Sequence, residues 1–348
     1  MNRLFLSLLV FIPLTLIAQM LGVSPSVIFF LAALSIIPLA KYIGEATEEL
    51  TAYTGPAIGG LLNATLGNVT ELIIGIFALQ AGLIEVVKAS ITGSIIGNLL
   101  LVLGMAMIGG GYARKEQRFN AVAAQAASST LLLAIIALVI PAVFLQTSGV
   151  GSNGLVEELS ITISVIMILV YAASLLFSLR THKHLYQEEV AHIEARWSKA
   201  KSLAVLSAST AMVALMSDAL VGSIEPLVLR LGWTQLFIGV IFIAIIGNVA
   251  EHYSAINVAL KNRMDLALQI SIGSATQIAM FVAPVLVLSS LLFSTHMNLV
   301  FNIFELVAII FSVFIVNAVV EDGASNWFEG VQLLAAYVII AVAFYFHP

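Results

Sequence analysis

The sequence predicts an all-α polytopic membrane protein, and three observations lead to this fold class. The 348 residues are 61% hydrophobic and 9% charged, with a mean hydropathy of +1.08. The apolar residues form long runs and not the alternating segments of a membrane β-barrel. A short motif with a carboxylate inside an apolar run occurs twice, which indicates an internal repeat.

Eleven hydrophobic segments are each long enough to cross a bilayer. They are 4–21, 25–43, 57–80, 83–109, 120–145, 156–180, 201–221, 234–260, 264–293, 299–320 and 328–347. The longer ones indicate tilted or broken helices. The run after Arg3 has no convincing signal-peptide cleavage site, so we expect it to be a retained first span.

The basic residues are unevenly distributed between the two ends of these segments. If successive segments alternate in direction, one side collects twelve of the 14 Lys and Arg residues; Lys88 and Arg230 are the exceptions. The positive-inside rule places that side in the cytoplasm, together with the N-terminus. We therefore expect a plasma-membrane protein with an extracytoplasmic C-terminus.

Segment 181–200 is the longest hydrophilic connection. It has mixed charge, permits a helix and is expected in the cytoplasm. A solvated connector is the favoured interpretation, and a regulatory metal site at His182, His184 and His192 is the alternative.

The repeated motif is GNVTE at Gly67–Glu71 and GNVAE at Gly247–Glu251, displaced by 180 residues. The same displacement aligns Gly-Ser at 93–94 with Gly-Ser at 273–274 without a gap. The second motif lies five segments after the first, in the eighth segment and not the third, and because five is odd the copies cross in opposite directions. Inverted repeats are typical of secondary transporters, whose sites lie near the midplane. We expect an extra helix at 1–22, five-helix repeats at 23–180 and 201–348, and a connector at 181–200.

The first motif belongs to a stripe of small and polar residues that a helix would present along one face. The stripe consists of Gly59, Asn63, Gly67, Glu71 and Gly75. It predicts a helix that another backbone can approach closely, with one acid directed at the contact.

An ionised carboxylate in hydrocarbon costs roughly 2.5–3.5 kcal/mol, so Glu71 and Glu251 need an explanation. A single acid of this kind could be structural. Two acids in the same motif, at matching depth in inverted copies, predict a site for a hard cation with oxygen ligands. The chain has no cysteine, and His252 is the only nearby imidazole, so a soft-metal site is disfavoured.

Two further groups of polar residues have weaker assignments. Polar residues in the segments that follow each motif, 83–109 and 264–293, could add oxygen ligands to the cation site. Ordinary packing of small residues is an equal alternative. His252 diverges by about 100° from Glu251 on a helix, so we expect a proton acceptor there and not a ligand. Glu45, Asp218 and Glu225 could line an access path for the cation, but solvated helix ends are the favoured interpretation.

The motifs resemble those of the calcium/cation antiporter superfamily, in its Ca²⁺/H⁺ exchanger branch of bacterial type. They are GNVTE at 67–71, GNVAEH at 247–252, GS at 93–94, GSATQ at 273–277 and DGASNWFEG at 322–330. The resemblance covers essentially the whole chain, and it implies proton-driven Ca²⁺ export. With the asparagines of both motifs, the expected ligands are Glu71, Glu251, Asn68, Asn248, Ser94, Asn98, Ser274 and Gln277. Members often carry a strongly acidic helix between the two halves, whereas this chain has only QEEVAHIEARW there.

The resulting prediction is a Ca²⁺/H⁺ antiporter that works by alternating access. Facing carboxylates repel one another, so protons and Ca²⁺ compete for the same pair. A Na⁺/Ca²⁺ or other cation antiporter with the same site is the alternative. An enzyme is not expected, because a repeated acid does not explain catalysis, and no cofactor is expected because Ca²⁺ is the substrate. The partners are Ca²⁺, H⁺ and the lipid bilayer; the net charge of −5 argues against nucleic acid, and a homo-oligomer stays open.

Overall fold

The computed structural model describes residues 3–112, 114–148, 153–181 and 195–347. The α-helices of the first half are α1 (Arg3–Leu8), α2 (Phe11–Met20), α3 (Pro25–Leu66), α4 (Val69–Gln80), α5 (Ile84–Ile96), α6 (Leu103–Gly111), α7 (Ala121–Thr147) and α8 (Asn153–Leu176). Those of the second half are α9 (Lys199–Val221), α10 (Ile224–Leu231), α11 (Gln235–Phe237), α12 (Ala244–Gly247), α13 (Val249–Leu260), α14 (Met264–Gln277), α15 (Ala283–Ser290), α16 (Ile303–Val320) and α17 (Trp327–Phe346). The histidines of the predicted connector lie outside the described residues.

Eight described helices are long and apolar enough to cross a membrane. The pair 235–247 and 249–260 adds a ninth span if it is taken as one segment bent by 59°. The first and third predicted segments appear as shorter apolar helices, Phe5–Met20 and Val69–Gln80. The all-helical membrane fold is therefore confirmed, whereas the count of eleven spans is not.

Helix α3 departs most from the prediction. The sequence predicts separate segments at 25–43 and 57–80, but α3 continues for 42 residues through the region between them. In that region, GEATEELTAYTGP, the stretch Glu45–Leu50 consists of good helix formers apart from Thr47, so its charge does not end the helix. The break comes later, at Gly67 and Asn68, so the stripe from Gly59 to Gly75 is not on one continuous helix as predicted.

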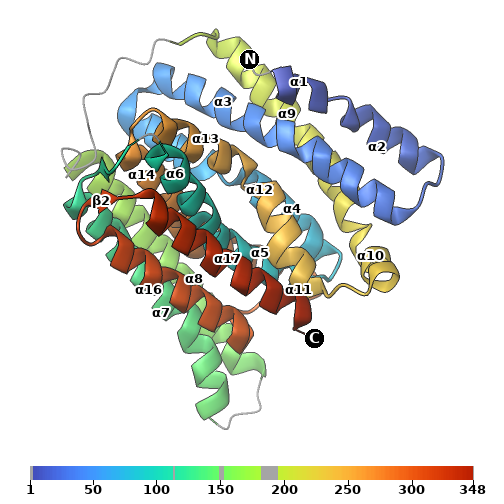
Figure 1. The fold of residues 1–348 in the computed structure, drawn as a ribbon. Helices are drawn as coiled ribbons and strands as arrows, with labels where there is room; N and C mark the ends of the chain where they lie inside the picture. Colours follow the sequence, from blue (N-terminus) through green and yellow to red (C-terminus); the bar gives the residue numbers. More distant parts are fainter. Residues whose placement is uncertain (1–2, 113, 149–152, 182–194, 348) are drawn as a thin grey trace.

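The helices with the repeated motifs lie inside the bundle (Figure 1). Helices α1, α2, α3 and α9 cover one side, and α7, α8, α16 and α17 cover the other; α4, α5, α12, α13 and α14 lie between them. The long α3 packs against α9, and α4 packs against α5, α9 and α15. This arrangement places both motifs away from the outer surface of the bundle.

Several interior helices contain π-helical turns. These turns are η1 (Gly97–Val102), η4 (Ile238–Ile243) and η5 (Ile278–Val282), with a further one, η2 (Phe177–Thr181), at the end of α8. Helix α5 crosses η4 at close range, because Gly93 lies against Val240 and Gly239 lies against Ala89. Such turns widen a helix locally and often occur beside functional residues.

A two-stranded pairing closes one end of the bundle. Strand β1 (Gln117–Arg118) pairs antiparallel with β2 (Ala324–Ser325), and Gln117 lies opposite Ser325. The pairing joins the segment before α7 to the segment before α17, although the two are more than 200 residues apart in the sequence.

Candidate cation site

Both copies of the motif interrupt a helix at the same residue. Asn68 has φ −102° and ψ 22°, and Asn248 has φ −94° and ψ 14°, so neither continues the helix before it. A new helix starts at the next residue and places Glu71 or Glu251 in its first turn. The amino-terminal end of a helix carries partial positive charge, which favours an anionic side chain there. Broken helices of this kind form the binding sites of many transporters.

The asparagines at the breaks bond across the bundle and do not cap their own helices. The Asn68 amide donates to Gln277 Oε1 at 2.6 Å, and both residues were predicted ligands. The Asn248 amide donates to Ser94 Oγ at 2.8 Å and to the Ala244 carbonyl at 2.9 Å. Each motif is thereby tied to a helix of the opposite half of the chain.

Asn98 connects the second motif to α14. Its amide nitrogen lies 2.7 Å from Asn248 Oδ1 and 3.0 Å from Ser274 Oγ, and it also donates to the Ser94 carbonyl at 3.0 Å. The four side chains are buried. Six of the predicted ligands, apart from the two acids, thus form two hydrogen-bonded groups inside the protein, and their role as ligands remains a prediction.

The two acids lie close together. Their carboxyl groups are near enough to interact electrostatically. Glu71 also rests against the other motif, because a Cβ added to Gly247 would lie 3.0 Å from Glu71 Cγ. The missing side chain at Gly247 therefore leaves room for the acid of the other half.

The buried oxygens of this region lack hydrogen-bond donors. Both carboxyl oxygens of Glu71, Oε2 of Glu251, and Oδ1 of Asn68 and of Asn98 are inaccessible and have no partner. The amide nitrogens of Asn68, Asn98 and Asn248, by contrast, all have partners. An unpaired buried acceptor is costly, and a cation removes that cost. Among the described residues no group of three or more His, Cys, Asp and Glu could hold a metal ion, so amide oxygens would have to complete a site built on two acids.

The other predicted functional residues have mixed surroundings. His252 is buried beside Glu251, as expected for a residue one position further along α13. Glu45 forms an ion pair with Lys41 at 2.9 Å, which weakens its attraction for a passing cation. Asp218, near the end of α9, and Glu225, in the first turn of α10, are exposed.

Two further acids in the membrane-spanning segments cap helices. Asn302 and Glu305 form a capping box at the start of α16, where Glu305 Oε2 accepts from the backbone N–H of Asn302 at 2.9 Å. The other carboxyl oxygen, Oε1, accepts from the Thr92 hydroxyl at 2.9 Å. Asn326 and Glu329 form the same box at the start of α17. Each pair follows the pattern Asn-x-x-Glu, so a search for capping boxes in the sequence would have found them.

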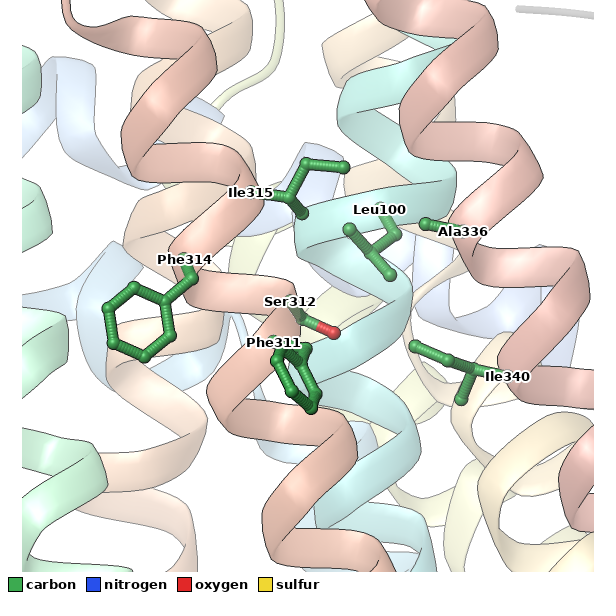
Figure 2. A pocket seen from close by; sticks show the side chains of 7 residues that line it. All are labelled: Leu100, Phe311, Ser312, Phe314, Ile315, Ala336 and Ile340. Carbon is green, nitrogen blue, oxygen red and sulfur yellow. The ribbon is translucent and has the colours of Figure 1, made fainter.

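An apolar groove of ≈ 400 Å³ lies outside this region, between α16 and α17 with η1 as its floor (Figure 2). Its lining residues are Leu100, Phe311, Ser312, Phe314, Ile315, Ala336 and Ile340. The one hydroxyl among them, on Ser312, already donates to the Ala308 carbonyl at 2.7 Å. The groove thus offers lipid-compatible surface and no free ligand for an ion.

An all-helical membrane bundle whose broken helices meet at two neighbouring acids, with three of their four carboxyl oxygens inaccessible, is typical of a secondary transporter of cations. Comparison with known proteins identifies the family. The model of the family described as sodium/calcium exchanger protein matches residues 24–180 and 201–346, and the chain belongs to that family. Within the superfamily, it falls in the Ca²⁺/H⁺ exchanger branch, as its relatives indicate.

The relatives match over their full length. The Ca²⁺/H⁺ antiporter ChaA of Bacillus subtilis is 49% identical, with 99% of each chain covered. The Ca²⁺/H⁺ antiporter of Aphanothece halophytica is 47% identical, with 100% of this chain and 97% of the relative covered. A solved structure of native YfkE has 46% identity and a TM-score of 0.88, and the match covers 99% of this chain and 100% of that one.

Proposed function

We infer that this protein exchanges Ca²⁺ for H⁺ across a membrane, with Glu71 and Glu251 binding the two ions in turn. The observation that carries this inference is the group of five buried, donor-free oxygens on Glu71, Glu251, Asn68 and Asn98. Oxygen ligands of this type suit Ca²⁺, which takes carboxylate and amide oxygens in flexible geometry. The activity for which the two antiporter relatives are named supports exchange of the same two ions.

The coupling follows from the charge of the two acids. With no ion bound, two neighbouring carboxylates repel one another, and a proton on either acid relieves the repulsion. Ca²⁺ compensates both negative charges at once and therefore displaces the proton. We take it that the site can switch its access from one side of the membrane to the other only when it is calcium-bound or protonated. Each ion that binds must then displace the other. That requirement is antiport.

We further propose how the chain lies in the membrane. The two stretches matched by the family model, 24–180 and 201–346, support a division into two halves around the connector. The motifs lie in the third and eighth predicted segments, an odd offset that makes the halves inverted, and the skew of basic residues places the N-terminus in the cytoplasm of a plasma-membrane protein. In this orientation the exchanger exports Ca²⁺ as protons move inward.

Purified protein in sealed vesicles tests the proposed function. A pH gradient alone should drive uptake of radioactive calcium, and a Na⁺ gradient at equal pH on both sides should not. Calcium uptake driven by Na⁺ alone would instead favour the sodium/calcium activity that the family's description names.

A further inference from the structure

The helices that carry the two acids end in the same type of turn. Helices α4 and α13 have 12 residues each, and a residue in the left-handed conformation follows each of them. In the α4 turn, Gly82 has φ 77°, and the Leu83 amide donates to the Ala78 carbonyl at 2.8 Å. In the α13 turn, Asn262 has φ 63°, and the Arg263 amide donates to the Val258 carbonyl at 3.0 Å. Both turns are the common glycine-type ending of a helix.

The residue in the left-handed position differs between the two turns. Gly82 adopts the conformation without strain, whereas Asn262 is the only residue other than glycine with a positive φ in the described part of the chain. Asparagine is the usual alternative to glycine at this position of a helix ending, at a cost in strain that glycine avoids. The contacts of the Asn262 side chain therefore show how this turn differs from the α4 turn.

The Asn262 side chain is hydrogen-bonded by Gln117. Its buried amide donates to Asn262 Oδ1 at 3.0 Å and to the Ala259 carbonyl, in the last turn of α13, at 3.1 Å. Arg114 adds a longer hydrogen bond of 3.4 Å to the Leu260 carbonyl. The side chain of Gln117 thus holds both the final turn of α13 and the residue that follows it.

Gln117 is itself fixed from two sides. Its backbone belongs to the β1–β2 pairing, and Gly110 leaves the space that the Gln117 amide occupies. Three residues further on, the backbone N–H of Asn120 donates to Asp265 Oδ1 at 2.6 Å. This bond joins the segment to the start of α14. The segment from Gln117 to Asn120 therefore joins the end of α13 and the start of α14 to the β1–β2 pairing.

The α4 turn has no matching attachment in the described residues. It is closed by backbone hydrogen bonds from Ala81, Gly82 and Leu83 to the preceding turn. A Cβ added to Gly82 would meet no atom within 4 Å, so the turn faces open space. The far end of α4 is thus free of the kind of clamp that holds α13.

We propose that Gln117 and Asn262 are positioning residues that fix Glu251 in the cation site, while the Glu71 helix is left free to adjust. Helix α13 is then held at both ends, by the Asn248 side chain beside Ser94 and Asn98 and by the Gln117 clamp at Ala259 and Asn262. This inference rests on the proposed exchange of Ca²⁺ for H⁺. According to this inference, asparagine stands at position 262, where the first half has Gly82, because it helps to position Glu251 and not because the turn requires it.

Asn262→Gly is the decisive variant, because it relieves the strained conformation and removes only the clamp's bond to Asn262, leaving the bond from Gln117 to the Ala259 carbonyl. We expect the Ca²⁺ concentration for half-maximal uptake to rise about threefold to tenfold, the range that one hydrogen bond carries. The maximal rate should stay within about twofold and the melting temperature should not fall, because glycine fits the left-handed turn. Asn262→Asp keeps the accepting oxygen and should restore the wild-type value, and Gln117→Leu should behave like Asn262→Gly.

Gly82→Asn is the matched control, since it places asparagine in the equivalent α4 turn, where a Cβ would contact no atom within 4 Å. It should leave half-maximal uptake unchanged. In amide hydrogen exchange, Asn262→Gly should accelerate exchange at the end of α13 and not at the end of α4.

Unchanged Ca²⁺ affinity in both Asn262→Gly and Gln117→Leu would overturn the inference, as would loss of stability in both without an affinity change. Absence of pH-driven uptake by the wild-type protein would instead contradict the proposed function itself, so the two failures are distinguishable.

Discussion

The two halves of the cation site start from the same five-residue pattern and end in different surroundings. In both, a Gly-Asn pair breaks a helix and an acid enters the first turn of the next one. In the Glu71 half, both carboxyl oxygens lack a donor, and one hydrogen bond joins Asn68 to Gln277. In the Glu251 half, Asn248 joins a network with Ser94 and Asn98, and His252 follows the acid.

The comparison teaches that the repeat determines where the helices break, and the residues outside the repeat determine how firmly each piece is held. Leu72 stands where the second copy has His252, and Gly82 stands where it has Asn262. Two similar halves can thus place their acids in the same local geometry while the helices that carry them have different hydrogen-bond partners.

Replacing either acid by glutamine has the largest expected effect. Glu71→Gln and Glu251→Gln keep the shape and one oxygen but cannot bind and release a proton. Each change should abolish exchange, and a higher Ca²⁺ concentration should not restore it. Radioactive-calcium uptake into pH-jumped vesicles measures this, with thermal melts as the check on folding; recovery of the wild-type rate at high Ca²⁺ would refute the shared-acid mechanism.

The two asparagine networks should differ in their contribution to Ca²⁺ binding. Asn98→Leu removes the donor to both Asn248 and Ser274, so we expect half-maximal uptake at about 10- to 100-fold more Ca²⁺. Asn68→Leu removes one bond, to Gln277, and should cost about 3- to 10-fold. Concentration series of calcium uptake give both values. Equal losses would mean that the two halves are held equally.

The histidine found in only one half sharpens the comparison further. His252→Leu makes the second motif resemble the first, where Leu72 stands. Because imidazole can exchange a proton, which leucine cannot, and is a poor ligand for a hard cation, the rate-versus-pH profile should shift while Ca²⁺ affinity changes less than about threefold. An equal loss of affinity at every pH would make His252 a ligand or a packing residue.

The same glutamate-to-glutamine change at a capping acid should have the smallest effect on transport. Glu305→Gln weakens the box that starts α16, which should lower the free energy of unfolding by about 1 kcal/mol. Chemical denaturation measures the loss, and half-maximal uptake should stay within about twofold. A large defect in exchange here would mean that intramembrane acids in general, and not the two in the repeated motif, carry the ions.

Much of the site follows from the sequence, because a carboxylate repeated inside apolar segments is hard to explain otherwise. Asn68 lies beside Gln277 and Asn98 beside Ser274, and their predicted role as ligands stays a prediction. The helix boundaries around the first motif were wrong, since charge in region 44–56 suggested a loop where helix propensity prevails.

Other features depend on contacts that no local pattern contains. The bond from Gln117 to Asn262 joins residues 145 positions apart, and neither stands out in a hydrophobic segment. The left-handed conformation at Asn262 could be suspected only because Gly82 occupies the matching place in the other half. A comparison of the two halves, residue by residue, is therefore more informative here than either half alone.

The central claim is that Glu71 and Glu251 hold Ca²⁺ and H⁺ in competition, and proton release on Ca²⁺ binding tests it most directly. Ca²⁺ is added to purified protein in a weakly buffered detergent solution, and the change in pH is recorded over a series of starting pH values. The account predicts that the wild-type protein releases protons as it binds Ca²⁺, most at low starting pH, and that Glu71→Gln and Glu251→Gln each release fewer per bound ion. Ca²⁺ binding by the wild-type protein without proton release at any pH would contradict it.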